Sequence, residues 1–196
     1  MLRPHAAPLA FAASLAAVAF AVPAAQATPS APSGTRGEPL APPAGHRLVA
    51  TYVVGTGSQV YECLPDAVAG ATWRGRPVAV LVATDAGGAT VGTHDSVAAQ
   101  GAPSVPQWSL VADGSRVTGR LATGGSFPAP DPAKAIPALR LDVVQNSGVG
   151  RLADVDTIQR DLVRGGVGPS GACDPATAQT TVSTYSARYT FWARTS

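Results

Sequence analysis

Histidines and carboxylates are the residues that could do acid–base or metal chemistry in this sequence, and they are sparse. His46 and His94 are the only histidines beyond the first five residues, so a three-histidine zinc site and an HExxH motif are both absent. Asp85, Asp95 or Asp113 could join His94 around a metal ion, but their spacing matches no ligand pattern. The sequence therefore predicts no metal site and no cofactor.

Hydrolytic chemistry would have to be assembled from distant positions. No GxSxG motif is present, because the serine of "GPSGA" stands in the wrong register for a nucleophile elbow. A triad-like site would need His94 or His46 as its base. We therefore keep, as an alternative, an extracellular hydrolase that uses His94 with Asp113 or Arg160. Nothing in the local sequence marks either histidine as catalytic, so an enzyme is not the favoured interpretation.

The glycine-rich stretch "IQRDLVRGGVGPSGAC", residues 158–173, could in principle cradle a phosphate. It lacks the lysine and the Ser/Thr of a GxxxxGK[ST] loop, and GxGxxG is also absent. We interpret Ile158–Val163 as a strand that carries Gln159 and Arg160, and Gly165–Gly171 as a turn region before the cysteine. The glycines are therefore predicted to shape the chain rather than to bind a ligand.

Strand alternation is the dominant pattern from residue 46 onward. It is clearest in "VSTYSARYTFWA", whose one face carries Tyr185, Ala187, Tyr189, Phe191 and Ala193. The segment "ALRLDVV" repeats the alternation, and Val78–Val82 is a two-sided apolar strand. Turn signals separate the strands at Gly87-Gly88, Asp113-Gly114 and Asn146 to Gly148.

These patterns, without a long amphipathic helix, predict an all-β fold. We expect an antiparallel β-sandwich or a barrel-like single domain over residues 46–196. One segment is ambiguous, because in residues 152–163 the apolar positions Leu152, Val155, Ile158 and Leu162 also fit a helical face. We favour a strand there and keep a helix as the alternative.

The N-terminal residues have the pattern of a secretory signal peptide. Arg3 precedes the uncharged run Leu9–Val22, and small residues at Ala25 and Ala27 predict cleavage before Thr28. The run is too short to span a bilayer, and no later stretch is apolar enough for a transmembrane helix. We expect a secreted protein in which residues 28–45, rich in Pro, Ala and Ser, form an extended linker.

The charge content excludes some classes of binding partner, and the cysteine content bears on whether the compartment is oxidising. The chain has 14 Lys and Arg against 12 Asp and Glu, with Lys134 as its single lysine, so it lacks the basic stripe that nucleic acids or anionic membranes require. Cys63 and Cys173 belong to no CxxC motif and have no histidine nearby as a co-ligand. In an oxidising compartment they predict one structural disulfide, with a reactive or metal-binding thiol as the alternative. We expect a monomer.

Several segments, in order, resemble one known family. They are "GSQVYEC", "ATDAGGATVGTH", "WSLVADGSRVTG", "IPALRL", "GRLADVDTIQRDLVRGGVGPSGACD" and "YSARYTFW". The family is the secreted one catalogued as domain of unknown function 3455, and the resemblance covers Leu40 to Trp192. It implies an exported, β-rich protein without an assigned activity. It also supports the pairing of Cys63 with Cys173, which occupy the family's two cysteine positions.

The resemblance also implies candidate ligand-binding residues. The positions that match its motifs are Gln59, Tyr61, His94, Trp108, Asp113, Gln159 and Arg160. The chain departs from the family in two places, with the long segment 95–107 after the Gly-x-His motif and with Ala138 where an aromatic residue is usual. The longer segment lies directly after His94.

Three functions are then open. The favoured one is a non-catalytic domain that binds a small molecule or an envelope component, because a β scaffold with polar loop residues can carry such contacts. The second is the hydrolase, and the third is a structural envelope-associated protein without a ligand. Convergence of His94, Trp108, Asp113, Gln159 and Arg160 on one concave pocket would favour a site.

Overall fold

The computed structural model describes residues 39–84, 88–98 and 104–196. These residues form eight strands and one short 3-10 helix: β1 (His46–Asp66), β2 (Gly70–Ala83), β3 (Thr90–Val97), β4 (Val105–Leu110), β5 (Arg116–Phe127), β6 (Ala138–Ser147), β7 (Thr157–Gly165), η1 (Pro175–Thr177) and β8 (Thr180–Arg194). The predicted signal peptide, residues 28–38 of the predicted linker and Gly87 of the predicted turn lie outside the described residues.

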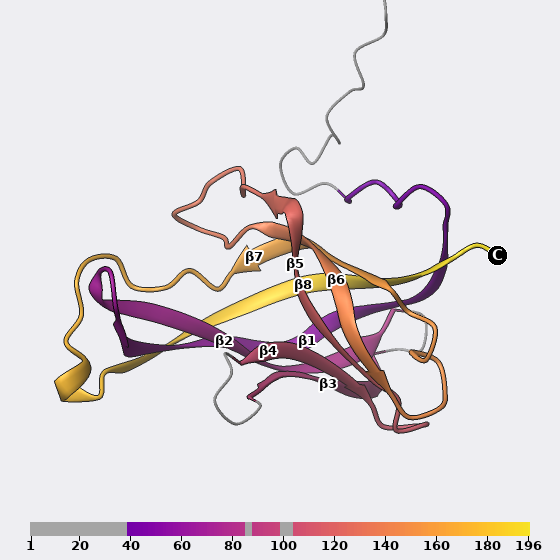
Figure 1. The fold of residues 1–196 in the computed structure, drawn as a ribbon, viewed down its shortest axis with the longest axis horizontal. Coiled ribbons are helices and arrows are strands. Elements are labelled where there is room, and N and C mark those ends of the chain that lie inside the picture. Colours follow the sequence, from indigo (N-terminus) through magenta and orange to yellow (C-terminus); the bar gives the residue numbers. More distant parts are fainter. Residues whose placement is uncertain (1–38, 85–87, 99–103) are drawn as a thin grey trace, which may run out of the picture. The chain divides into compact units, whose positions relative to one another are not determined.

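Each strand is antiparallel to the next, and β8 pairs back onto β1, so the sheet closes into a barrel (Figure 1). The all-β prediction is confirmed, and closure decides between the sandwich and the barrel. The face predicted from the alternation in β8 is the inward one, since Tyr185, Ala187, Tyr189, Phe191 and Ala193 are all buried. An eight-stranded barrel has an interior that side chains just fill.

The connections divide the barrel into two ends. We call the end with the β1–β2, β3–β4, β5–β6 and β7–β8 connections the mouth, and the opposite end, where β1 starts and β8 finishes, the base. The interior towards the base is apolar and aromatic, and includes Tyr52, Leu81, Leu110, Ile158 and Phe191. This packing is the main hydrophobic core.

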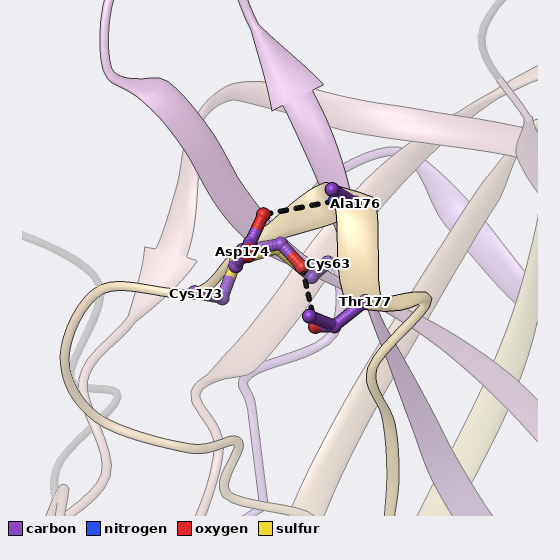
Figure 2. Close-up of a disulfide and its surroundings, with 5 residues drawn as sticks. All are labelled: Cys63, Cys173, Asp174, Ala176 and Thr177. Carbon is purple, nitrogen blue, oxygen red and sulfur yellow. Dashed lines mark hydrogen bonds between the residues drawn. A yellow bond between two sulfur atoms is a disulfide. The ribbon is translucent and has the colours of Figure 1, made fainter.

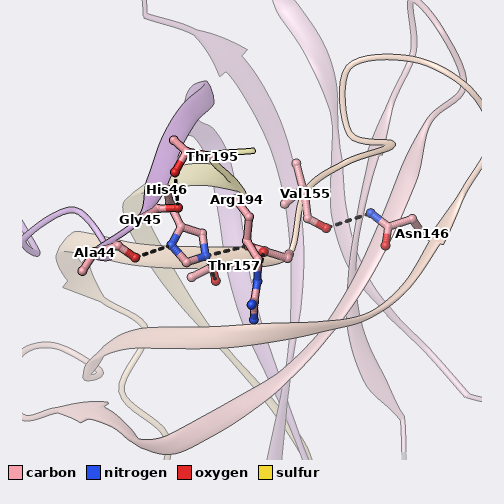
Figure 3. Close-up of polar contacts among 9 residues, drawn as sticks. Ala44, Gly45, His46, Asn146, Val155, Thr157, Arg194 and Thr195 are labelled. Carbon is pink, nitrogen blue, oxygen red and sulfur yellow. Dashed lines mark hydrogen bonds and ion pairs between the residues drawn. The ribbon is translucent and has the colours of Figure 1, made fainter.

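The β6–β7 connection, residues 148–156, closes the base. Leu152 and Val155 are buried in the core, and Asn146 Nδ2 donates to their carbonyls at 3.0 and 2.9 Å. Figure 3 shows the bond to Val155. The strand favoured for residues 152–163 is therefore wrong before Thr157, and the helical alternative is also wrong. Leu162 lies in a β-bulge with φ of 50° and is exposed. The helix-like spacing of apolar residues in this segment therefore comes from a buried connection followed by a bulged strand, not from a helix.

The two ends of the barrel strands meet at the base. His46 lies opposite Arg194 in the ladder, and its Nε2 is 3.0 Å from Asp156 Oδ1. Arg194 Nε lies 3.0 Å from the other oxygen of Asp156, and Thr195 Oγ1 donates to the Gly45 carbonyl at 2.9 Å (Figure 3). These polar contacts tie β1, β8 and the β6–β7 connection together.

The segment just before β1 is packed against the barrel. The amide of Leu40 donates to Asp161 Oδ2 at 2.8 Å, and Gln159 Nε2 donates to the Ala41 carbonyl at 2.8 Å. Leu40 is buried. The sequence places these residues in the linker, whereas hydrogen bonds to β7 hold the last part of that linker, residues 39–45, in place.

Two connections differ in length from the prediction: the one between β3 and β4 is shorter, and the one between β4 and β5 is longer. In the segment 95–107, residues 95–97 belong to β3 and residues 105–107 to β4, whereas residues 99–103 lie outside the described residues. The hairpin expected at Asp113-Gly114 exists, but the connection between β4 and β5 spans residues 111–115 instead of two. Asp113 Oδ1 accepts from the Ser115 amide at 2.9 Å, which stabilises this longer turn.

The predicted disulfide is present. Cys63, near the end of β1, is bonded to Cys173, 110 residues later in the β7–β8 connection (Figure 2). The short helix η1 follows directly, with Asp174 Oδ1 accepting from the Ala176 amide at 2.9 Å. The bond therefore ties the β7–β8 connection to the β1–β2 hairpin at the mouth.

The glycines of the 158–173 stretch are architectural, as predicted. Tyr61 Oη donates to the Gly166 carbonyl, and the Tyr61 ring lies between Gly75 and Gly168. A Cβ at Gly75 or at Gly168 would stand 2.6 Å from the Tyr61 ring, so a larger residue at either position would displace the ring. Tyr61 thus holds the β7–β8 connection over the mouth.

Loss of the disulfide should destabilise the barrel strongly. For a bridge that closes 110 residues, we expect reduction to lower the free energy of unfolding by about 4–5 kcal/mol, because the unfolded chain regains loop entropy. Urea unfolding with and without reductant measures this difference. The Cys63→Ala, Cys173→Ala double variant is the control and should not respond to reductant. Equal unfolding midpoints for oxidised and reduced wild type would contradict the prediction.

Candidate functional site

A cavity of about 180 Å³ lies in the mouth half of the barrel. Five strands bring polar side chains to it: Gln59 from β1, His94 from β3, Trp108 from β4, Arg160 from β7 and Tyr189 from β8. The structure therefore brings together four residues that the sequence singled out, from four separate motifs. Barrel closure is what makes them neighbours.

The His94 ring is fixed on three sides. Its Nδ1 lies 2.8 Å from the Gln107 carbonyl, which can only accept, so Nδ1 carries the proton and Nε2 carries the lone pair. The ring stacks on Trp108 with centroids 4.3 Å apart and planes within 7°. Tyr189 meets it edge-on at 4.9 Å. These contacts hold one tautomer and one orientation.

Burial keeps His94 neutral. The pKa of His94 is lowered to about 3, mainly because the ring is removed from water; the bond to Gln107 opposes the shift, and the nearby Arg160 charge adds to it. At neutral pH the ring is therefore an uncharged donor at Nδ1 and an acceptor at Nε2. A general base with so low a pKa would hold a proton poorly.

Arg160 is the cation of the cavity. It is 9% exposed, and its Nη2 donates to the Pro137 carbonyl at 2.9 Å. No carboxylate of the described residues forms an ion pair with it. Burial raises the pKa of Tyr61 and of Tyr189, and the Arg160 charge opposes that rise in both. The Arg160 charge therefore acts on both phenol groups.

Four buried donors in the cavity wall have no hydrogen-bond partner. They are Gln59 Nε2, Trp108 Nε1, Arg160 Nε and the Tyr189 hydroxyl. A buried donor without a partner costs about 1–3 kcal/mol, and native proteins contain few of them. Their concentration around one cavity indicates a site that is completed by something with acceptor atoms.

Tyr185 adds a further hydroxyl behind this wall. Its side chain is buried, and burial together with the adjacent Tyr189 raises its pKa. The two hydroxyls lie close together, but neither has a hydrogen bond of good geometry. Both phenols are protonated and can act as donors.

Gln159, a predicted candidate, does not reach the cavity. Adjacent residues of a strand point to opposite faces, so Gln159 lies on the outer face when Arg160 lies inside. Its Nε2 donates to Ala41, and its Oε1 accepts from Thr190 Oγ1 at 3.3 Å. Gln159 is buried under the segment before β1, where it has a structural role.

Asp113 is also elsewhere, at the base. Its carboxylate accepts from the Ser115 hydroxyl at 2.6 Å and from the Arg151 amide at 2.7 Å, and these bonds lower its pKa. It lines a separate cavity of about 430 Å³ together with Tyr52 and Arg151. The structure therefore does not bring Asp113 to His94, and the proposed pairing of the two is not formed.

Sequence reasoning missed part of the cavity wall. Strand alternation places Tyr189 on the hydrophobic face of its strand, and Ser96 and Pro106 fall in the long segment 95–107 that carries no motif. A tyrosine in an inward strand position needs a partner for its hydroxyl, and that requirement was the available signal. Within the described residues, no group of three His, Cys, Asp or Glu side chains could hold a metal ion.

The fold and the cavity define a closed antiparallel β-barrel with a small, polar-walled cavity beneath its mouth. Residues 43–193 match the family described as "Protein of unknown function (DUF3455)", and the chain belongs to that family. No curated protein and no solved structure matches the chain. In the part of the chain that the structure describes, no helix is long and apolar enough to cross a membrane.

The buried neutral His94 should make the barrel acid-sensitive. Its pKa falls from 6.5 to about 3 on folding, so the unfolded state binds the proton more tightly. The resulting stability is fully present above pH 6.5 and is lost as the pH falls towards 3, at about 1.4 kcal/mol per pH unit.

His94→Asn keeps a donor for the Gln107 carbonyl but does not titrate. Urea unfolding of wild type and variant between pH 7 and pH 4 separates this contribution from the carboxylates, which are common to both proteins. We expect the stability difference between them to shrink or reverse at low pH. A difference independent of pH would contradict a neutral, buried His94.

Proposed function

We propose that this chain is an exported, non-catalytic barrel protein that binds a small ligand in the cavity beneath its mouth. One observation carries the proposal: four nine-tenths-buried side chains that line a single cavity each have a donor atom without a hydrogen-bond partner. In a purely structural barrel those positions would be filled by apolar side chains or by paired polar groups.

The size of the cavity limits the ligand. A cavity of about 150 Å³ holds a benzene molecule, so about 180 Å³ suits a compound somewhat larger than benzene. Its walls combine the polar groups with the apolar side chains of Pro77, Pro106, Leu139 and Leu141. A compact ligand with one polar end and one apolar body matches this lining.

The hydrolase alternative has less support. Its base would be His94, whose pKa of about 3 suits a fixed neutral acceptor, and Asp113 orients a turn at the base. Arg160 lines the same cavity as His94, but a guanidinium cannot take a proton. The residues of the cavity therefore favour binding over hydrolysis.

Filling the cavity should abolish binding without unfolding the barrel. Leu139→Trp places a larger side chain in the cavity wall, whereas Val144→Trp, on the exposed face of the same strand, is the matched control. We expect compounds from a panel of small neutral, anionic and cationic molecules to raise the Tm of wild type and of the control, and not that of Leu139→Trp. A saturating ligand adds about 2.7 kcal/mol at one hundred times its Kd.

The readouts are thermal unfolding and ligand-detected NMR, with circular dichroism to show that each variant is folded. Ser96→Phe, from β3, serves as a second filling variant if Leu139→Trp does not fold. If no compound binds wild type, or if the binders bind the filled variants equally well, the cavity is not a binding site.

A further inference from the structure

The charge inside the cavity is unbalanced. Arg160 is the charged side chain in its wall, and the remaining lining residues are neutral or apolar, with His94 uncharged. The guanidinium is nine-tenths buried and, among the described residues, has no carboxylate partner. A buried cation without an anion is unfavourable, and proteins usually pair such groups.

The same region of the barrel contains a paired arginine for comparison. Arg188, on the outer face of β8, donates from Nε and Nη2 to the two oxygens of Asp161 at 2.8 and 2.7 Å. That bidentate pair raises the pKa of Arg188. Arg160, which is more buried, has only neutral groups beside it, the carbonyl of Pro137 and the nearby Tyr189 hydroxyl. Arg188, on the outer face, therefore has a carboxylate partner, whereas Arg160, which lines the cavity, has none among the described residues.

The groups around Arg160 also suit an anion. Its own Nε, Trp108 Nε1, Gln59 Nε2 and the Tyr189 hydroxyl are all donors without partners. A carboxylate accepts at both oxygens, and its flat fork matches the edge of a guanidinium. A single positive charge balances a monoanion, whereas a phosphate dianion would leave a net negative charge buried.

We infer that the ligand is a small organic monocarboxylate with a compact apolar body. This inference rests on the proposed function. The carboxylate is held by Arg160 and the neighbouring donors, and the body lies against Leu139, Leu141 and the Trp108 ring. The apolar wall favours a branched or cyclic body over an extended chain, because the space is short and closed towards the base by the core.

Shape-matched pairs of probes that differ in charge test the inference. Benzoate and cyclohexanecarboxylate are compared with benzamide and cyclohexanecarboxamide, which have nearly the same shape and no charge, by calorimetric titration near neutral pH. We expect each carboxylate to bind wild type about 10- to 150-fold more tightly than its amide, as hydrogen bonds to a charged group predict. Phenyl phosphate is tested as a dianionic probe and should bind more weakly than benzoate.

Variants then assign the preference to Arg160. In Arg160→Met the tighter binding of the carboxylate relative to its amide should disappear. Arg160→Lys should keep part of this difference in affinity, because lysine keeps the positive charge but lacks the paired N–H donors of a guanidinium. Arg164→Met, an exposed arginine of the same strand, is the matched control and should bind like wild type. An unchanged preference in Arg160→Met would overturn the inference.

Stability without ligand gives a second readout. If the role of Arg160 is to bind an anionic ligand, its charge is unpaired when no ligand is bound. Arg160→Met should then unfold at the same or a higher urea concentration than wild type, because an unpaired buried charge is removed. Arg188→Met should unfold at a lower concentration, because it leaves the buried Asp161 carboxylate without a cation. A loss in Arg160→Met as large as that in Arg188→Met would make Arg160 a structural residue and overturn the inference.

The outcomes separate the two proposals. If amides bind as tightly as carboxylates, and Leu139→Trp abolishes both, cavity binding stands and the carboxylate inference is wrong. The same holds if other compounds of the panel bind the cavity and no carboxylate does. If nothing binds wild type, the proposed function fails together with the inference.

Discussion

The pairing of β1 with β8 is the constraint on which the rest of this structure depends. It joins strands from opposite ends of the described chain, from His46 opposite Arg194 to Glu62 opposite Thr180. Once the ring of eight strands is closed, its radius is limited and every inward side chain must lie in the core or at an internal cavity. The disulfide and the contacts of Tyr61 hold the mouth end of the same two strands together with the β7–β8 connection.

The closed interior has two parts with opposite character. Towards the base, aromatic and aliphatic side chains fill the barrel, and Leu152 and Val155 seal it. Towards the mouth, Gln59, His94 and Arg160 enter the same interior, where the low dielectric makes each unpartnered polar group unfavourable. The apolar half and the disulfide stabilise the barrel enough to hold a polar half whose hydrogen bonds are incomplete. Such local conflicts with the folding rules are typical of functional sites.

His94 and Trp108 illustrate how the fold sets chemistry. A histidine on the surface would titrate near neutral pH, whereas the stack on Trp108 and the bond to the Gln107 carbonyl hold His94 as one neutral tautomer. Arg160 contributes the opposite feature, a permanent charge. Together they make a cavity wall with many donors and one positive charge, and this composition is the basis of both proposals.

Much of this could be predicted from the sequence, and the limits have clear causes. The alternation of β8 and the disulfide followed from local pattern and composition, and the family followed from the resemblance of several motifs. Gln159 was grouped with Arg160 although the two-residue period of a strand already places neighbours on opposite faces. Asp113 was grouped with His94 although an Asp-Gly pair more often orients its own turn, as Asp113 does here.

What the sequence determined by itself was therefore local: the all-β class, the apolar face of β8 and the single pair of cysteines that forms the disulfide. The tertiary structure decided that the sheet closes, that residues 152–156 seal the base, and that Gln59, His94, Trp108, Arg160 and Tyr189 share one cavity. The physical reason is that these depend on strand register and on pairing between distant segments. Local propensity does not encode either, and the closure of the ring sets both at once.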